Sequence, residues 1–138
     1  MKGRWLYVVG AGLLLARGPA FAHHSFSAEF DRDKPITVTG TVTKVEWANP
    51  HARFYIDAKD DKTGKVVNWD FELASPNGLM RRGWTRNSMK VGDTVTVTGH
   101  GAKNAEYVGN ASTVTLANGK KLFAGSSGDS ETAGSAAK

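Results

Sequence analysis

Four histidines are the strongest metal-type donors in this cysteine-free chain, and two of them directly follow Ala20-Phe21-Ala22. Cleavage after Ala22 would make His23 the first residue, with a free α-amino group as well as an imidazole. Amine and imidazole nitrogens together suit Cu(II), which favours tetragonal nitrogen and oxygen ligands. We therefore expect a copper site drawn from all four histidines, which are His23, His24, His51 and His100.

In this hypothesis His23 supplies the amine and Nδ1, and His51 supplies a further imidazole nitrogen. His24 or His100 completes or flanks the site. Zinc fits less well, because its structural sites usually have four ligands and often thiolates. Each histidine also has an ordinary interpretation, either as a polar residue beside a cleavage site, as a cap of the Asn49-Pro50 turn, or as a solvated loop residue.

The first 22 residues have the organisation of a secretory signal peptide. Lys2 and Arg4 precede an apolar run over residues 5–16, and the small-x-small end follows. The run is shorter than the roughly 20 residues of an ordinary membrane span. We therefore expect a periplasmic protein without stable membrane insertion after cleavage. Removing 22 of the 138 residues leaves 116, and the net charge falls from +5 to +2 because the segment carries three basic residues and no acid.

A charge of +2 on an exported domain does not favour a nucleic-acid partner. The segment Arg81-Arg82-Gly83-Trp84-Thr85-Arg86 nevertheless combines basic and aromatic side chains. This combination predicts a surface for a protein, a glycan or another anionic ligand, formed by Arg81, Arg82, Trp84 and Arg86. The alternative is that Trp84 packs in the core while the arginines face water over apolar surface.

Enzyme activity is the function class with the least support. Asp57, Asp70 and Glu72 are interpreted as surface acids, and no Ser-His-Asp order, phosphate loop or dinucleotide fingerprint is present. An oxidative copper enzyme is a third hypothesis. It would need an open coordination position and a substrate surface. The leading prediction is an exported binding domain that holds Cu(II), and its competitor is a metal-free interaction module.

The elements that must position these residues follow from composition and periodicity. Residues 23–34 form a polar arm with Phe26 and Phe30, and residues 35–124 form one domain. Residues 125–138 are Gly, Ser, Ala and charged residues, a composition typical of a disordered tail.

Within the domain the apolar residues alternate with period two, which indicates β-strands. The alternation changes phase near Thr43-Lys44, which predicts a bulge, and Ser75-Pro76 predicts the start of a short helix. Asn118-Gly119 predicts a type I′ hairpin. The order favours an all-β fold: a five-stranded OB-like Greek-key barrel with one short helix between strands three and four. A different small β-barrel and an open β-sandwich are the alternatives.

Several motifs together resemble the domain-of-unknown-function family 6152. They are His23-His24-Ser25-Phe26, Glu29-Phe30-Asp31, Gly40 to Trp47, Asn49-Pro50-His51 and Arg81-Arg82-Gly83-Trp84. The resemblance extends to near Gly125 and implies a small exported bacterial β-domain, without implying an activity. His23, His24 and His51 match these motifs, whereas His100 does not.

Overall fold

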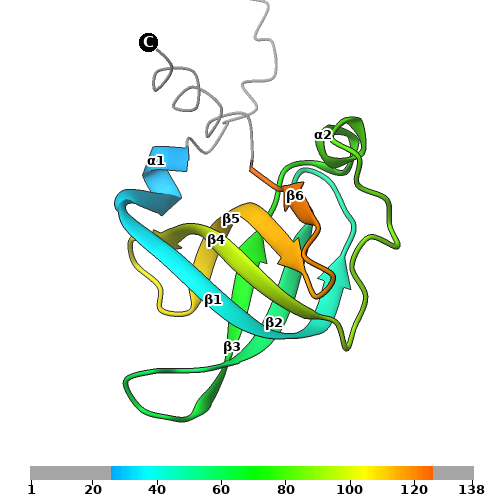
Figure 1. Cartoon of the computed structure of the whole chain (residues 1–138). Helices are drawn as coiled ribbons and strands as arrows, with labels where there is room; N and C mark the ends of the chain where they lie inside the picture. The colour runs from blue at the N-terminus through cyan, green and yellow to red at the C-terminus, as the bar shows by residue number, and fades with distance from the viewer. Residues whose placement is uncertain (1–25, 126–138) are drawn as a thin grey trace, which may run out of the picture.

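The computed structural model describes residues 26–125, which form six strands and two short helices (Figure 1). The elements in chain order are α1 (Phe26–Glu29), β1 (Phe30–Glu46), β2 (Arg53–Lys59), β3 (Val66–Glu72), α2 (Pro76–Arg81), β4 (Thr94–Ala102), β5 (Val108–Leu116) and β6 (Lys121–Phe123). The all-β expectation is confirmed, with six strands where five were expected and a second helix. Neither helix of this part of the chain is long and apolar enough to cross a membrane.

One sheet contains all six strands in the order β3-β2-β1-β4-β5-β6. Consecutive neighbours pair antiparallel, and β3 also pairs with β5 in parallel, so the sheet closes on itself. The 17-residue β1 serves two neighbours, since its first part pairs with β4 and its last part with β2. The register between β1 and β2 shifts between Val42 and Lys44, which confirms the predicted bulge.

The N-terminal arm contributes more to the sheet than its polar sequence predicts. β1 begins at Phe30, which pairs with Ala102 of β4, and the Phe30 side chain is buried. Residues 26–29 form α1, where no helix was predicted. Burial of the Phe30 side chain stabilises this extension. Strand β1 therefore begins five residues before Pro35, where the domain was predicted to begin.

The core lies inside the closed sheet and continues under α2. Phe54 and Phe71 pair across β2 and β3 with stacked rings, 5.4 Å between centroids. The other large core side chains are Val42, Ile56, Leu73, Leu79, Trp84, Met89, Val95, Val97, Val114 and Leu122. At the start of α2 the Ser75 hydroxyl accepts a hydrogen bond from the Gly78 amide, which confirms the predicted cap.

The Asn118-Gly119 signal does produce a hairpin, which joins β5 to β6. Gly119 has φ +83°, whereas Tyr107 is the one non-glycine residue of the described part with a positive φ. A type I′ turn needs positive φ at both central residues, so that prediction is wrong. The Leu116 amide bonds to the Lys120 carbonyl at 2.9 Å, enclosing a three-residue loop that ends in the left-handed glycine.

Candidate functional site

His51 lies in the loop between β1 and β2, where the sequence predicts it, and its ring is held in one orientation. Nδ1 is 3.0 Å from the Leu73 carbonyl oxygen. Because a carbonyl oxygen only accepts, Nδ1 carries the proton, and the lone pair of the neutral ring is on Nε2. A backbone carbonyl that fixes the tautomer in this way is typical of metal-ligating histidines. The side chain is 40% exposed, so it is accessible to a ligand.

Beside His51 lies a charged network on the outer surface of β2 and β3. Arg53 donates to both carboxylate oxygens of Asp70 at 3.0 Å and lies 3.5 Å from the Glu72 carboxylate. Glu72 is also 3.8 Å from His51 Nδ1. Burial raises the pKa of the Glu72 carboxyl, against the opposing effects of His51 and Arg53.

The surface-acid interpretation therefore holds unequally for the three acids. Asp57 is exposed and accepts a hydrogen bond from Asn68, and Asp70 is the ion-pair partner of Arg53. The Glu72 side chain is only 13% exposed, so this acid is partly covered, although it lies beside Arg53 as the interpretation requires.

Register places Glu72 in a line of polar residues that crosses the sheet. Arg53 of β2 pairs with Glu72 of β3, Glu72 pairs with Asn110 of β5, and Asn110 pairs with His100 of β4. Directly paired residues point to the same face of a sheet. Since the flanking pair Phe54 and Phe71 faces the core, these four side chains are on the outer face. We call Arg53, Glu72, Asn110 and His100 the polar row.

The helix α1 lies against the His100 end of the polar row. The Phe26 ring meets the His100 ring edge-on, with centroids 5.5 Å apart, and it also packs on Phe30. Glu29 is close enough for its charge to raise the pKa of Glu72. Figure 1 shows α1 and the β1–β2 loop at the same end of the molecule, opposite the β2–β3 hairpin.

His100 lies within β4, and not just after it as the sequence predicts. Strand β4 reaches Ala102 because it pairs with the extended β1. Asn110 is a residue that the sequence analysis missed, although it is buried at 0% exposure. An asparagine between Gly109 and Ala111 in a strand is its sequence signal, because small neighbours allow close coverage of a polar side chain.

The two remaining predicted ligands, His23 and His24, lie outside the described residues. Within residues 26–125 no three His, Cys, Asp or Glu side chains are grouped so that they could hold a metal ion. The structure thus links His51 and His100 through Glu72 and Asn110, and does not assemble a complete metal site from this part of the chain.

The second candidate, Arg81 to Arg86, divides into a buried and an exposed part. Trp84 is 2% exposed and its indole N–H donates to the Phe123 carbonyl oxygen at 2.6 Å. It is a core residue, so its prediction as a partner-binding side chain is wrong. Arg82 donates to the Gly125 carbonyl oxygen, while Arg81 and Arg86 are exposed.

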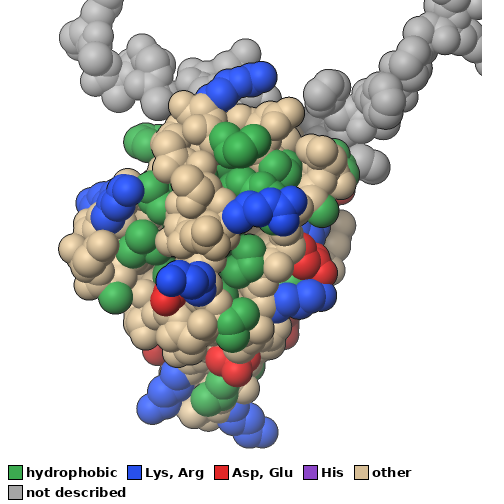
Figure 2. All heavy atoms as spheres, turned by 90° about the vertical axis from the view of Figure 1, so that its right-hand side faces the viewer, with side chains coloured by type: hydrophobic (Ala, Val, Ile, Leu, Met, Phe, Trp, Pro, Cys, Tyr) green, Lys and Arg blue, Asp and Glu red, His purple; other side chains and the backbone are tan. Residues whose placement is uncertain are grey.

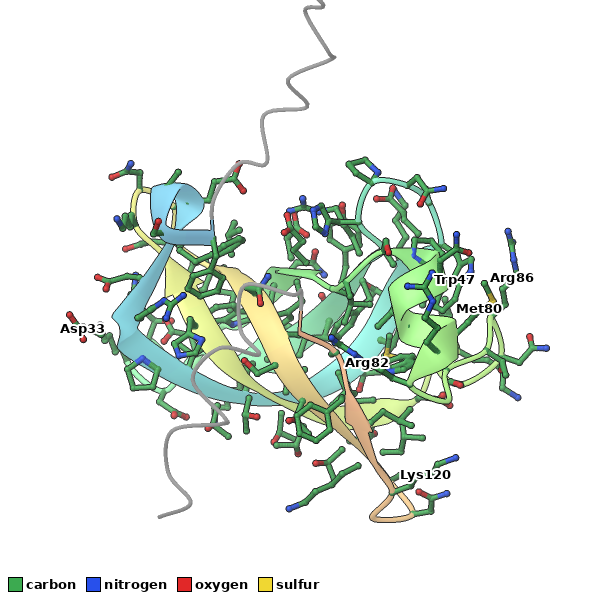
Figure 3. All side chains as sticks on the ribbon, turned by 90° about the horizontal axis from the view of Figure 1, so that it is seen from above. Asp33, Trp47, Met80, Arg82, Arg86 and Lys120 are labelled. Carbon is green, nitrogen blue, oxygen red and sulfur yellow. The ribbon has the colours of Figure 1, made fainter. Side chains whose placement is uncertain are left out.

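Around α2 the surface mixes cations with apolar side chains. Figure 2 shows lysine and arginine side chains dispersed among hydrophobic ones on this side, with few acids. Met80 is 51% exposed, and Figure 3 shows it on the same side of the molecule as Trp47 and Arg86. A shallow, open depression lies on this surface, lined by Val45, Trp47, Leu73, Trp84, Thr85, Arg86 and Met89.

Comparison with models of protein families finds a family that matches the chain. The model of a family of unknown function (DUF6152) matches residues 12–111. The chain belongs to this family. The DUF6152 match includes the arm, His51 and the Arg81 to Arg86 segment, and it ends within β5, short of the Gly125 end that the resemblance implied. No curated protein matches the chain in sequence.

Proposed function

We propose that this chain is an exported, periplasmic OB-like binding domain that holds Cu(II) through its mature N-terminal histidine and His51. The strand order, with β3 pairing β5 and a helix between β3 and β4, supports the OB-like interpretation. The seating of Phe26 against His100 is the observation that carries the metal proposal, because it anchors the arm beside the polar row.

Covalent geometry limits how far the mature N-terminus can be from this point. His23 is three positions before Phe26, and an extended chain spans at most about 3.6 Å per residue, or about 11 Å in all. On this proposal the amine and imidazole of His23 lie at the end of the molecule that carries His51. His51 adds an Nε2 lone pair whose orientation is fixed by the Leu73 carbonyl.

The donor set consists of neutral nitrogens with carboxylate and amide oxygens nearby, which suits Cu(II). His24 or His100 completes or flanks the site. We propose a role in metal handling or buffering for this site.

A Cu(II) titration of protein purified from periplasm, with intact-mass analysis of its first residue, tests this proposal. We expect one tight equivalent and a multi-nitrogen electron spin resonance signal. Adding one alanine ahead of His23 moves the amine and should weaken binding at least about tenfold, the loss expected when one ligand of a chelate is removed. His51→Ala should also weaken it, while Arg86→Glu serves as a surface control. Unchanged affinity in the extended protein would refute the chelate.

A metal-free interaction module is the second candidate, favoured by the exposed Met80 next to Arg81 in α2 and by Arg86 in the lining of the depression. Cations around apolar surface suit an anionic partner with an apolar portion. Charge reversal at Arg81 and Arg86 should abolish capture of such a partner and leave Cu(II) affinity unchanged. Capture that survives the reversal would reject this surface.

A further inference from the structure

Asn110 presents an unsatisfied hydrogen-bonding group in the polar row. Its side chain is completely buried, yet within residues 26–125 neither Oδ1 nor Nδ2 has a hydrogen-bond partner. The adjacent His100 Nδ1 is also a buried atom that has no hydrogen-bond partner in the described part of the chain. Buried polar atoms are nearly always paired in native proteins, and leaving them unpaired is costly. Three unpaired atoms on two neighbouring strands indicate a missing partner at this place.

The missing partner must approach from the side of α1. Gly109 and Phe71 face the core in the adjacent row, so Asn110 faces outward. Phe26 covers His100, which pairs directly with Asn110. The described structure therefore begins, at Phe26, next to the His100–Asn110 pair. The residues that precede Phe26 in the chain are the nearest candidates for the missing hydrogen-bond partner.

The chemistry of a carboxamide limits the possible partners. Asn110 offers one acceptor oxygen and a donor N–H₂ group in one plane. A backbone peptide group carries the complementary pair, one N–H and one carbonyl. A carboxylate would satisfy only the donor and an ammonium only the acceptor, so a peptide backbone fits Asn110 better than an isolated charge.

We propose that residues 23–25 of the processed chain dock along the polar row, with a backbone peptide group paired to the Asn110 carboxamide. This inference rests on the cleavage after Ala22 in the proposed function, and it does not require copper. Docking would hold the His23 amine in place before metal arrives, which reduces the ordering cost of metal binding.

The first test compares thermal unfolding of four metal-free proteins in EDTA. They begin at His23 or at Phe26, each with Asn110 or with Asn110→Leu, a substitution of similar shape without polar atoms. With Asn110 present, loss of residues 23–25 should lower Tm by about 4–8 °C, the shift typical for a domain of this size losing about one net hydrogen bond. With Asn110→Leu the same truncation should change Tm little. Equal losses in both backgrounds, or none in either, would overturn the proposal.

A second measurement uses the unaltered mature protein, so it does not depend on how the variants fold. Proton NMR should show contacts between the Asn110 side-chain amide and protons of residues 23–25. Contacts of that amide with a long-lived water alone would overturn the proposal and make the partner a buried water. Copper affinity is measured separately, so docking without tight Cu(II) binding would reject only the metal proposal, and a mature start other than His23 would reject the shared premise.

Discussion

At the scale of single residues, Trp84 lies in a motif typical of a binding surface, yet its side chain is part of the hydrophobic core. Its ring is buried and its N–H donates to the Phe123 carbonyl of β6. Trp84→Phe keeps most of the apolar contact and removes this donor, so we expect unfolding free energy to fall by about 2 kcal/mol. Arg86→Ala, on the exposed part of the same segment, should change it by less than about 0.5 kcal/mol. Urea unfolding measures the free energy of both variants. Equal losses would contradict the assignment of Trp84 to the buried part and Arg86 to the exposed part of the segment.

At the scale of elements, the backbones of β4 and β5 approach each other closely at Gly99. A Cβ added to Gly99 would lie 1.9 Å from the Asn110 carbonyl oxygen, which is backbone and cannot move freely. The register shifts at this point, between Thr98 and Gly99. Gly99→Ala should therefore destabilise the protein by about 3 kcal/mol or more, because the two strands must separate.

Gly101 on the same strand is the matched control. An added Cβ there meets the Lys34 side chain at 2.9 Å, and that flexible chain can shift. We expect Gly101→Ala to cost much less than Gly99→Ala in thermal unfolding. A comparable cost for both would show that loss of glycine itself, and not the contact with Asn110, is responsible.

The β2–β3 turn depends on one carboxylate and should respond to acid. Asp60 accepts hydrogen bonds from the Lys62 amide, the Thr63 hydroxyl and the Tyr107 hydroxyl, which together lower its pKa below the ordinary 3.8. Because the folded pKa is the lower one, this contribution to stability is present above pH 3.8 and is lost as pH falls through the folded pKa. Wild type should exceed Asp60→Asn in Tm at pH 7, and the difference should shrink below pH 3.8. A difference that is constant with pH would contradict this role of the carboxylate.

At the scale of the whole molecule, the copper proposal depends on where the mature chain begins. Signal peptidase needs a small residue directly before the cut, so Ala22→Asp should leave the precursor uncleaved. Intact-mass analysis of periplasmic and membrane fractions should find a His23 start for wild type and the full precursor for the variant. Ser25→Ala, after the cut, is the control. Another start residue in wild type would remove the amine chelate on which the copper proposal depends.

The sequence by itself determined the features that depend on neighbouring residues. Alternation over two residues predicted the strands and the bulge near Thr43-Lys44, and Ser75-Pro76 predicted the start of α2. These signals are local, since side-chain direction and helix capping are set within a few positions. The loop position of His51 followed for the same reason.

Only the tertiary structure decided which residues share a surface. His100 belongs to β4 because it pairs with Pro35 of β1 and Asn110 of β5, and the β3–β5 pairing aligns Glu72 with Asn110. Burial of Trp84 likewise depends on a strand that lies far along the chain. Strand register and the burial of a side chain both depend on contacts between segments that are remote in sequence. The free energy of these contacts comes from packing between the segments, and a local sequence pattern does not encode it.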